Sequence, residues 1–370
     1  MYIDQKIQPR KALQHIQPYH PGKPIWEVQK ELGINRVIKL ASNENPIGPS
    51  PKAIEAISNS LLGINRYPDA NATNLKEAIA SHFQLQMEQI ILTNGADEII
   101  TLISETFLEE GDEVIVPSPS FSEYDFGAHL MGAKVVSVSL GEQFEYDIEA
   151  IISAVTEQTK MIYICSPNNP TGTYIPKGQL QQLLDSLPEQ VLVVFDGAYS
   201  HYAESDDYTN GLEFVSLGYP IVVLQTFSKI YGLAGIRVGF GVAPEAIIHN
   251  ILKVKEPFNV NMLAQVAAAA AIADDSHIQT SQEVNKYGRE WLYREFSNLE
   301  LHYIESMSNF VLVKIGTNAK NVYEKLLAKG IIVRYGGTWG LPEYIRISVG
   351  TSKENAVLIG LLSSILQDDY

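Results

Sequence analysis

Residues 221–240 read IVVLQTFSKIYGLAGIRVGF. The opening apolar run is typical of a strand that is buried on both faces of a parallel sheet. Lys229 follows just past the end of this strand, in a glycine-rich loop, with Thr226 and Ser228 before it and Arg237 after it. A lysine with apolar neighbours and a second cation nearby is easier to keep neutral, and a neutral amine can form a Schiff base. Most lysines are solvated surface residues, so the rest of the chain must decide between the two interpretations.

The same texture recurs along the first two thirds of the chain, where short β-branched runs alternate with helical stretches. The predicted strands are Gln89–Thr93, Glu113–Pro117, Lys134–Val138, Lys160–Cys165, Leu192–Asp196, Ile221–Gln225 and Arg237–Val242. Helical stretches such as Asp97–Leu108, Ile148–Val155 and Lys177–Leu187 separate many of them. Strands that alternate with helices indicate βαβ units. The sequence therefore predicts an α/β fold with a mostly parallel, seven-stranded sheet flanked by helices.

From about residue 245 the pattern becomes more helical and then mixed, which predicts a smaller α+β domain. Its expected helices are Ala264–Asp274, Ser281–Ser297 and Asn318–Lys329, and its expected strands are Asn309–Ile315, Ile331–Arg334 and Tyr344–Val349. The first 40 residues contain several prolines and little periodicity, as in an arm or a lid. We expect an N-terminal arm (1–40) that is part of the small domain, a large domain (41–260) and a small C-terminal domain (261–370).

Composition narrows the class of protein. The chain has 370 residues, 45% hydrophobic and 19% charged, which is ordinary for a globular protein. A net charge of −16 argues against nucleic-acid binding, which normally needs a basic patch. Cys165 is the single cysteine, so internal disulfides and a cysteine-based metal site are excluded and a reducing, cytoplasmic setting fits. We expect no signal peptide, no membrane span and no metal.

Polar residues follow several of the predicted strands. Residues 94–98 (NGADE) open a helix, where backbone N–H groups favour an anion, and residues 166–172 (SPNNPTG) form a rigid turn. Asp196 ends an apolar strand and Tyr199 follows it. Taken singly, each feature has an ordinary interpretation as a capped turn or a capping carboxylate. Together with Lys229 they meet at the carboxyl edge of one sheet, where α/β folds bind ligands.

These groups supply an anion cup, a donor for a ring oxygen, a carboxylate for a ring nitrogen and an amine, the set that pyridoxal 5'-phosphate needs. Here the sequence resembles the fold-type I, pyridoxal-phosphate-dependent aminotransferases, and within them the histidinol-phosphate aminotransferase family. The resemblance covers nearly the whole chain. The matching segments, in order, are 19–23, 42–46, 66–69, 94–98, 167–172, 196–199, 226–239, 308–310, 332–334 and 345–351.

The resemblance implies roles around the cofactor. Lys229 would form the Schiff base and then act as the base, Asp196 would hold the pyridine nitrogen, and Asn169 and Tyr199 would bind the ring 3' oxygen. The implied phosphate cup consists of Gly95, Ala96, Asp97, Thr226, Ser228 and Arg237, with Tyr67 added from the neighbouring subunit of a homodimer. Tyr124 is expected to stack on the ring, with Phe121 as the alternative.

The resemblance also implies two anion sites for substrates. Arg346 would take the α-carboxylate of glutamate in a bidentate salt bridge. Tyr19 and Arg334 would help bind the phosphate of histidinol phosphate, and Asn43 would lie in the segment that lines the entrance. The implied reaction moves an amino group between L-histidinol phosphate and 2-oxoglutarate, in histidine biosynthesis.

The chain departs from the family pattern in two places. Most relatives carry Glu where this chain has Gly197, and residues 336–340 (GGTWG) match only loosely. An aromatic-amino-acid aminotransferase would share every cofactor residue, as would a lyase similar to threonine-phosphate decarboxylase. A cofactor-binding regulator would need a DNA-binding domain, for which no segment is left over. A nicotinamide dehydrogenase is disfavoured because residues 235–241 do not read G-x-G-x-x-G.

Overall fold

The computed structural model describes residues 8–16 and 22–368. Its centre is a seven-stranded sheet in the order β2-β8-β7-β6-β5-β3-β4, and β8 alone runs antiparallel to its neighbours. The strands are β2 (Ile90–Thr93), β3 (Glu113–Ser118), β4 (Lys134–Ser139), β5 (Thr159–Cys165), β6 (Leu192–Asp196), β7 (Ile221–Thr226) and β8 (Gly239–Val242). The predicted mostly parallel sheet is therefore confirmed, with each strand close to its expected position.

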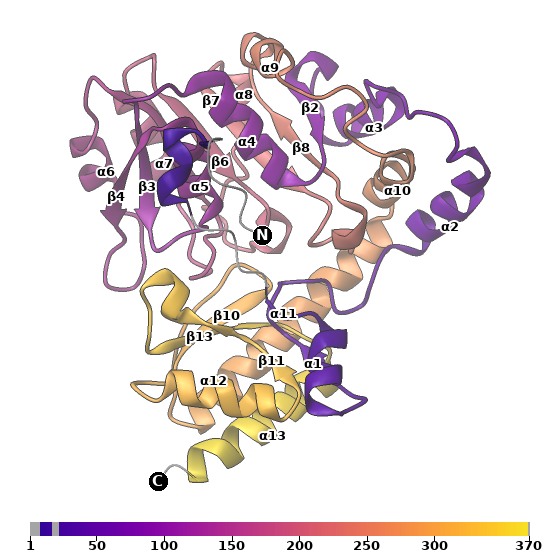
Figure 1. The fold of residues 1–370 in the computed structure, drawn as a ribbon, viewed down its shortest axis with the longest axis vertical. Helices are drawn as coiled ribbons and strands as arrows, with labels where there is room; N and C mark the ends of the chain where they lie inside the picture. Colours follow the sequence, from indigo (N-terminus) through magenta and orange to yellow (C-terminus); the bar gives the residue numbers. More distant parts are fainter. Residues whose placement is uncertain (1–7, 17–21, 369–370) are drawn as a thin grey trace.

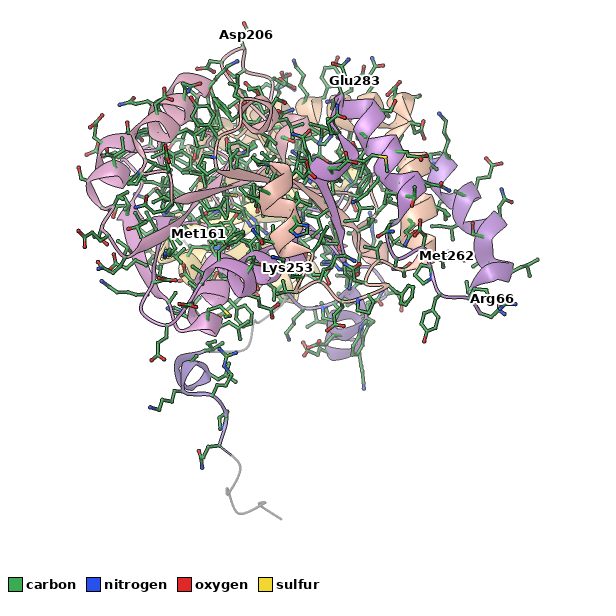
Figure 2. All side chains as sticks on the ribbon, turned by 90° about the horizontal axis from the view of Figure 1, so that it is seen from above. Arg66, Met161, Asp206, Lys253, Met262 and Glu283 are labelled. Atoms are coloured by element: carbon green, nitrogen blue, oxygen red, sulfur yellow. The ribbon has the colours of Figure 1, made fainter. Side chains whose placement is uncertain are left out.

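Helices cover both faces of this sheet (Figure 1). They are α3 (Thr73–Phe83), α4 (Ala96–Phe107), α5 (Glu123–Met131), α6 (Ile148–Ser153), α7 (Lys177–Ser186), α8 (Leu212–Ser216), α9 (Glu245–Ile251) and α10 (Met262–Ile272). A further helix, α2 (Pro51–Ser60), packs on α10. Successive residues of a strand point to opposite faces. On β6, Val193 and Phe195 therefore join the core under α3, α7 and α10, whereas Leu192 and Val194 join the core under α4, α5 and α9. Figure 2 shows side chains filling the space around Met161, which is fully buried on β5.

The smaller domain is built on a four-stranded antiparallel sheet in the order β12-β13-β10-β9. Its strands are β9 (His302–Ile304), β10 (Phe310–Lys314), β12 (Arg334–Tyr335) and β13 (Tyr344–Ser348), and its helices are α11 (Asp275–Asn298), α12 (Ala319–Ala328) and α13 (Ser352–Asp368). A two-stranded parallel sheet joins β1 (Ile38–Lys39) to β11 (Ile331–Ile332). The structure also has short 3₁₀ helices: η1 (Lys11–His15), η2 (Leu61–Gly63), η3 (Met87–Gln89), η4 (Ser200–Tyr202), η5 (Ala234–Ile236) and η6 (Gly336–Trp339).

The packing bears on the expected division into domains. Pairing of β1 with β11, and contact of Val28 on α1 (Ile25–Leu32) with Ile332, favour the placement of the N-terminal arm with the small domain. The alanines of α10 pack into the same core as α2 and α3. The expected boundaries near residues 40 and 260 stay predictions. The expected strand Ile331–Arg334 is split at Val333, because its two halves pair in different sheets. Across the described residues, no helix combines the length and the apolar character that a membrane span requires.

Candidate active site

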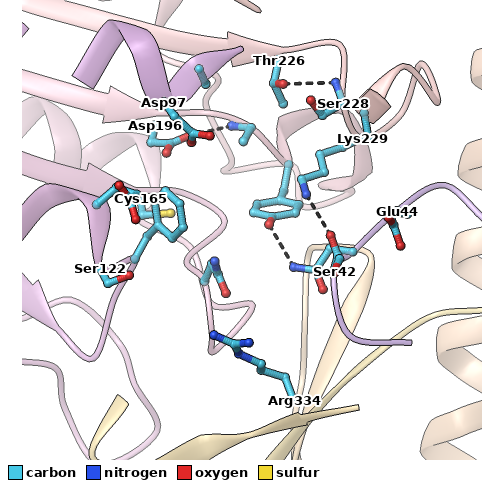
Figure 3. Close-up of a pocket in the computed structure, with 18 of the residues that line it drawn as sticks. Ser42, Glu44, Asp97, Ser122, Cys165, Asp196, Thr226, Ser228, Lys229 and Arg334 are labelled. Atoms are coloured by element: carbon cyan, nitrogen blue, oxygen red, sulfur yellow. Dashed lines mark hydrogen bonds between the residues drawn. The ribbon is translucent and has the colours of Figure 1, made fainter. Parts of the chain in front are cut away.

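A cavity of about 570 Å³ opens at the carboxyl ends of β5, β6 and β7, where the large sheet meets the small domain (Figure 3). Asp196 and Lys229 enter it from the large domain, and Arg334 enters from the opposite side. The predicted residues that line it are Asn43, Ala96, Asp97, Asn169, Asp196, Tyr199, Thr226, Ser228, Lys229, Arg237, Arg334 and Arg346. Segments far apart in sequence thus meet at the sheet edge where ligands bind in α/β folds.

Lys229 is partly buried in the loop after β7. Its Nζ donates a hydrogen bond to the carbonyl oxygen of Ser42 at 3.1 Å and lies 5.6 Å from the centre of the Tyr199 ring. Burial, followed by the positive charge of Arg346, lowers the pKa of Lys229 to about 8. The amine is therefore neutral at near-neutral pH far more often than an ordinary lysine, which is what a nucleophile or base requires.

Asp196 ends β6 as a buried carboxylate, only 5% exposed. Oδ2 accepts a hydrogen bond from the Tyr124 hydroxyl at 2.7 Å, and Oδ1 accepts one from the Ala198 N–H at 3.0 Å. Burial raises the pKa of Asp196, because a desolvated negative charge is unfavourable. A cation bound in the cavity would stabilise the ionised form, so the site suits a protonated ring nitrogen.

Tyr199 lies three residues after Asp196, and Asn43 holds it in place. The Asn43 amide donates to the Tyr199 hydroxyl at 2.9 Å, and the Asn43 side chain and main chain both bond to Ser348 on β13. Asn43 has a φ of 56°, in the left-handed region that Asn tolerates better than most residues. Burial raises the pKa of the Tyr199 phenol, so the phenol keeps its proton and can donate it to a ligand oxygen.

Arg346 connects the small domain to the turn after β5. Its Nη1 donates to the Asn169 side-chain oxygen and its Nη2 donates to the Ala41 carbonyl oxygen at 2.6 Å. The guanidinium also lies over the rings of Phe310 and Trp339, at 5.1 and 5.0 Å. Because Oδ1 of Asn169 accepts from Arg346, the Nδ2 hydrogens of Asn169 remain the donors that it can offer to a ligand.

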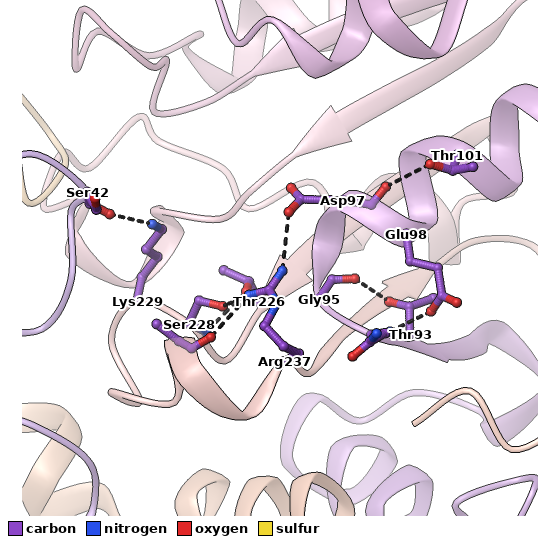
Figure 4. A network of polar contacts seen from close by, with 12 residues as sticks. Ser42, Thr93, Gly95, Asp97, Glu98, Thr101, Thr226, Ser228, Lys229 and Arg237 are labelled. Carbon is purple, nitrogen blue, oxygen red and sulfur yellow. Dashed lines mark hydrogen bonds and ion pairs between the residues drawn. The ribbon is translucent and has the colours of Figure 1, made fainter. Parts of the chain in front are cut away.

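Arg237 lies against the start of α4 (Figure 4). Its guanidinium pairs with Asp97 at 3.2 Å and donates to the Ser228 hydroxyl at 3.4 Å. Gly95 is required here, because a Cβ at that position would lie 2.4 Å from Nη2 of Arg237 and φ is +85°. α4 begins at Ala96 without a side-chain cap. Cationic, hydroxyl and free N–H donors thus converge on one point, as an anion site requires.

The structure corrects the prediction for Tyr124, which was expected to stack on the cofactor ring. The Tyr124 side chain is fully buried, stacks on Tyr163 at 4.3 Å and donates its hydroxyl to Asp196. It therefore offers no ring face to the cavity, contrary to the expectation that it stacks on the cofactor ring. Phe121, the alternative, does line the cavity. The cause is the helix start: α5 begins at Glu123 and turns Tyr124 into the core, whereas Phe121 precedes the helix.

Tyr67 is not among the residues that line the cavity. Tyr67 is 83% exposed and stacks on Phe258 at 4.8 Å, at the surface. Tyr19 lies outside the described residues. Their expected roles, contact with a neighbouring subunit's cofactor and with the substrate phosphate, stay predictions.

Two cavity residues, Ser42 and Trp339, carry little signal in the sequence. The Ser42 contribution is a backbone carbonyl, which any residue type provides. Trp339 lies between two arginines, 6.0 Å from Arg334 and 5.0 Å from Arg346, in the segment that matched the family only loosely. Trp339 could have been predicted only if β12 and β13 had been recognised as a hairpin, because the hairpin brings this loop residue near both arginines.

The Gly197 departure has a local explanation. A Cβ at Gly197 would lie 2.6 Å from the side-chain nitrogen of Gln225. Gln225 is buried and its Oε1 accepts a hydrogen bond from Ser200 at 3.2 Å. The Gln225 side chain therefore fills the space into which a residue at 197 would project, and it holds the loop that carries Tyr199.

Comparisons with known proteins agree with this geometry. The family described as "Aminotransferase class I and II" matches residues 35–362. The histidinol-phosphate aminotransferase of Moorella thermoacetica is 46% identical over 96% of this chain and 92% of its own length. That of Caldicellulosiruptor saccharolyticus is 43% identical over 96% and 99%. In fold, the chain is similar to the crystal structure of histidinol-phosphate aminotransferase from Sinorhizobium meliloti in complex with pyridoxal-5'-phosphate, with a TM-score of 0.91, 24% identity and coverage of 98% of each chain.

Proposed function

We propose that this chain, which belongs to the family of class I and II aminotransferases, transfers an amino group between L-histidinol phosphate and 2-oxoglutarate with bound pyridoxal 5'-phosphate. The products would be imidazole-acetol phosphate and glutamate, and the enzyme would act in histidine biosynthesis. One observation carries the substrate assignment. Two arginines, Arg334 and Arg346, enter the cavity opposite Lys229 and Asp196, which gives an anion site for each of two different amino donors.

The residues present fit the cofactor. The buried Asp196 carboxylate suits the ring nitrogen, and the Arg237 guanidinium with the start of α4 suits the phosphate. The gap at Gly95 supports this assignment, since a side chain there would fill the space beside Arg237. Phe121, which lines the cavity, would cover a face of the cofactor ring. When bound, pyridoxal phosphate draws electrons from the carbon that carries the substrate's amino group.

Lys229 is the residue that moves the proton. With the cofactor bound, the Lys229 amine would hold its aldehyde group, and as a free base it would carry the proton that leaves the substrate Cα. The Ser42 carbonyl, the hydrogen-bond acceptor of Lys229, keeps Nζ near this path. Tyr199 and Asn169 would donate hydrogen bonds to the ring 3' oxygen, and Asp196 would keep a proton on the ring nitrogen.

Substrate choice rests on the small domain. Arg346 would bind the α-carboxylate of glutamate, because a guanidinium matches a carboxylate bidentately. Histidinol phosphate lacks that carboxylate, so its phosphate would bind Arg334, with Tyr19 as a further predicted partner. A ping-pong reaction needs this pair, since both amino donors must react at one Lys229.

We also propose a homodimer in which Tyr67 reaches the phosphate of the partner subunit's cofactor. The support is an exposed apolar segment after α2, where Leu62 is 99%, Ile64 64% and Tyr67 83% exposed. Figure 2 shows the neighbouring Arg66 at the outer edge of the molecule. Clustered exposed apolar residues mark interaction surfaces. A cytoplasmic location remains a prediction, supported by the single buried Cys165.

Subunit complementation tests the dimer. Subunits with Tyr67→Ala and subunits with Lys229→Ala should each have low activity as homodimers. Mixed dimers should recover activity at one of the two sites, because one site would combine a normal Lys229 with a normal Tyr67 of the partner. No recovery after verified subunit exchange would contradict the proposed role of Tyr67.

The substrate is tested by comparing amino donors. Histidinol phosphate should exceed phenylalanine and tyrosine in kcat/KM, and Arg334→Ala should remove that preference. Arg294→Ala, an exposed arginine of α11 away from the cavity, is the matched control. Equal rates for the three donors in the unmodified protein would instead favour an aromatic-amino-acid aminotransferase.

A further inference from the structure

Arg334 and Arg346 are directly opposite each other in the antiparallel pair of β12 and β13. Residues paired in this way have neighbouring side chains on the same face of the sheet. Two like charges in such a pair repel, and here both guanidinium groups reach one cavity. An aromatic ring that attracts both guanidinium groups would offset part of this repulsion.

Trp339 supplies such a ring. It ends η6, in the loop that joins β12 to β13, and it is half-buried although Gly337, Thr338 and Gly340 around it are exposed. Its ring centre is 6.0 Å from Cζ of Arg334 and 5.0 Å from Cζ of Arg346. The face of an indole ring is negative and attracts guanidinium groups, and Trp is the strongest of the aromatic residues in this respect. One ring thus contacts both cations of the pair.

The loop is shaped to bring Trp339 back over the hairpin. A Cβ at Gly336 would lie 2.4 Å from the Leu341 carbonyl oxygen, and one at Gly337 would lie 2.3 Å from the Tyr335 ring. Gly340 has a φ of +73°, the left-handed region. The glycines on either side of Trp339 therefore permit a fold-back that a loop with side chains at these positions could not make.

Arg346 has anchors besides Trp339. It donates to Asn169 and to Ala41, and it lies over Phe310. Loss of the indole should therefore leave the glutamate site largely intact, and its effect should be sought with the phosphorylated donor.

We propose that Trp339 is a positioning residue that holds Arg334 beside Arg346 and so sets the preference for phosphorylated over unphosphorylated amino donors. This inference rests on the proposed function. It assigns a specificity role to the loop at residues 336–340, where this chain departs from the pattern of its relatives.

The experiment compares L-histidinol phosphate with L-histidinol, which lacks the phosphate, in the loaded enzyme. Trp339→Leu should lower kcat/KM for histidinol phosphate about tenfold. The change should lie in KM, with kcat and the rate with histidinol near those of the unmodified protein. Inorganic phosphate, used as a competitive inhibitor, should bind more weakly by a similar factor. Trp339→Phe should keep most of the preference, because it keeps a ring.

Tyr344→Leu is the matched control. Tyr344 lies on β13, the strand that carries Arg346. Its ring centre is 5.9 Å from Nζ of Lys314, but Tyr344 does not line the cavity. This variant loses a cation–π contact from the same sheet and should leave the ratio between the two donors unchanged. If Trp339→Leu does not fold, Trp339→Met, which has similar apolar volume and no ring, replaces it.

The outcomes separate the inference from the function on which it rests. If the unmodified protein does not prefer histidinol phosphate to histidinol, the proposed function is wrong. If it does prefer histidinol phosphate, but folded Trp339→Leu or Trp339→Met keeps the full ratio, Trp339 has no positioning role. Equal losses with both donors, through kcat, would also overturn the inference, because they would indicate only structural damage.

Discussion

The two sides of the cavity are built in different ways. On the large-domain side, Asp196 is the last residue of one buried parallel strand and Lys229 lies three residues after another, so the sheet itself fixes their positions. On the small-domain side, Arg334 and Trp339 belong to a short hairpin with an exposed glycine-rich loop. The contrast separates two tasks. The chemistry common to both amino donors is placed on the rigid sheet, and the choice between donors is placed where loop sequence can change.

The segment that contains Ser42 and Asn43 contacts both sides of the cavity. Ser42 accepts a hydrogen bond from Lys229, and Asn43 bonds to both Tyr199 and Ser348. Arg346 adds a direct link to Asn169. The sides therefore have separate origins in the sequence but are in contact in the fold, and variants can show how far their functions are separable.

The largest expected effect tests whether the sheet side is indifferent to substrate. Asp196→Ala should lower the rates of both half-reactions, with histidinol phosphate and with glutamate, by the same factor of about 10³. The reason is that the carboxylate acts on the cofactor ring, which both donors share. Single-turnover rates of the two half-reactions measure it.

Asp196→Asn is the control, because it keeps nearly the same size but lacks the negative charge, so it should also be strongly impaired. If the two half-reactions lose rate by factors that differ more than tenfold, Asp196 also affects the choice of donor, and the two sides of the cavity do not have separate tasks.

The sheet side was largely predictable from sequence. Parallel strands buried on both faces read as continuous apolar runs, so the positions where these runs stop locate Asp196 and Lys229. The rule that ligands bind at the carboxyl ends of such strands then brings the two residues together without knowledge of any contact. The family resemblance supplied their roles.

Two features, one on each side of the cavity, were less predictable, for physical reasons. Sequence spacing did not reveal that α5 begins at Glu123, which turns Tyr124 into the core and leaves Phe121 at the cavity. The strand expected at Ile331–Arg334 divides between two sheets, so the pairing of Arg334 with Arg346 was hidden. Packing against the core determines how Tyr124 is turned, and strand pairing determines how Ile331–Arg334 divides. Neither leaves a periodic signal in the sequence.

An intermediate effect is expected at Gly197, in the loop that carries Tyr199. Gly197→Ala should destabilise the protein by about 1–3 kcal/mol and lower kcat, because the new Cβ meets the Gln225 amide at 2.6 Å and displaces the loop that carries Tyr199. Thermal unfolding and kcat measure the two effects.

The double variant Gly197→Ala/Gln225→Ala decides the cause. Shortening Gln225 removes the clash, so the double variant should be more stable and more active than Gly197→Ala alone. Simple addition of the two single losses would show that Gln225 is not the residue that requires glycine at 197.

The smallest expected effect measures how strongly the two sides are coupled. Burial and the positive charge of Arg346 hold the pKa of Lys229 at about 8, so the rate at which cofactor-free protein takes up pyridoxal phosphate should rise with pH to a midpoint near 8. Arg346→Gln removes a repelling charge, which favours protonated Lys229, so its pKa and the midpoint should move upward. The shift should be less than about one pH unit, because burial is the larger cause and remains.

Arg334→Gln is the control in the same hairpin and should leave the midpoint unchanged, and Lys229→Ala should abolish the lysine-linked absorbance. If Arg346→Gln leaves the midpoint near 8, the small domain governs only which donor binds. An upward shift would mean that Arg346, a substrate-side residue, also tunes the amine on which both half-reactions depend.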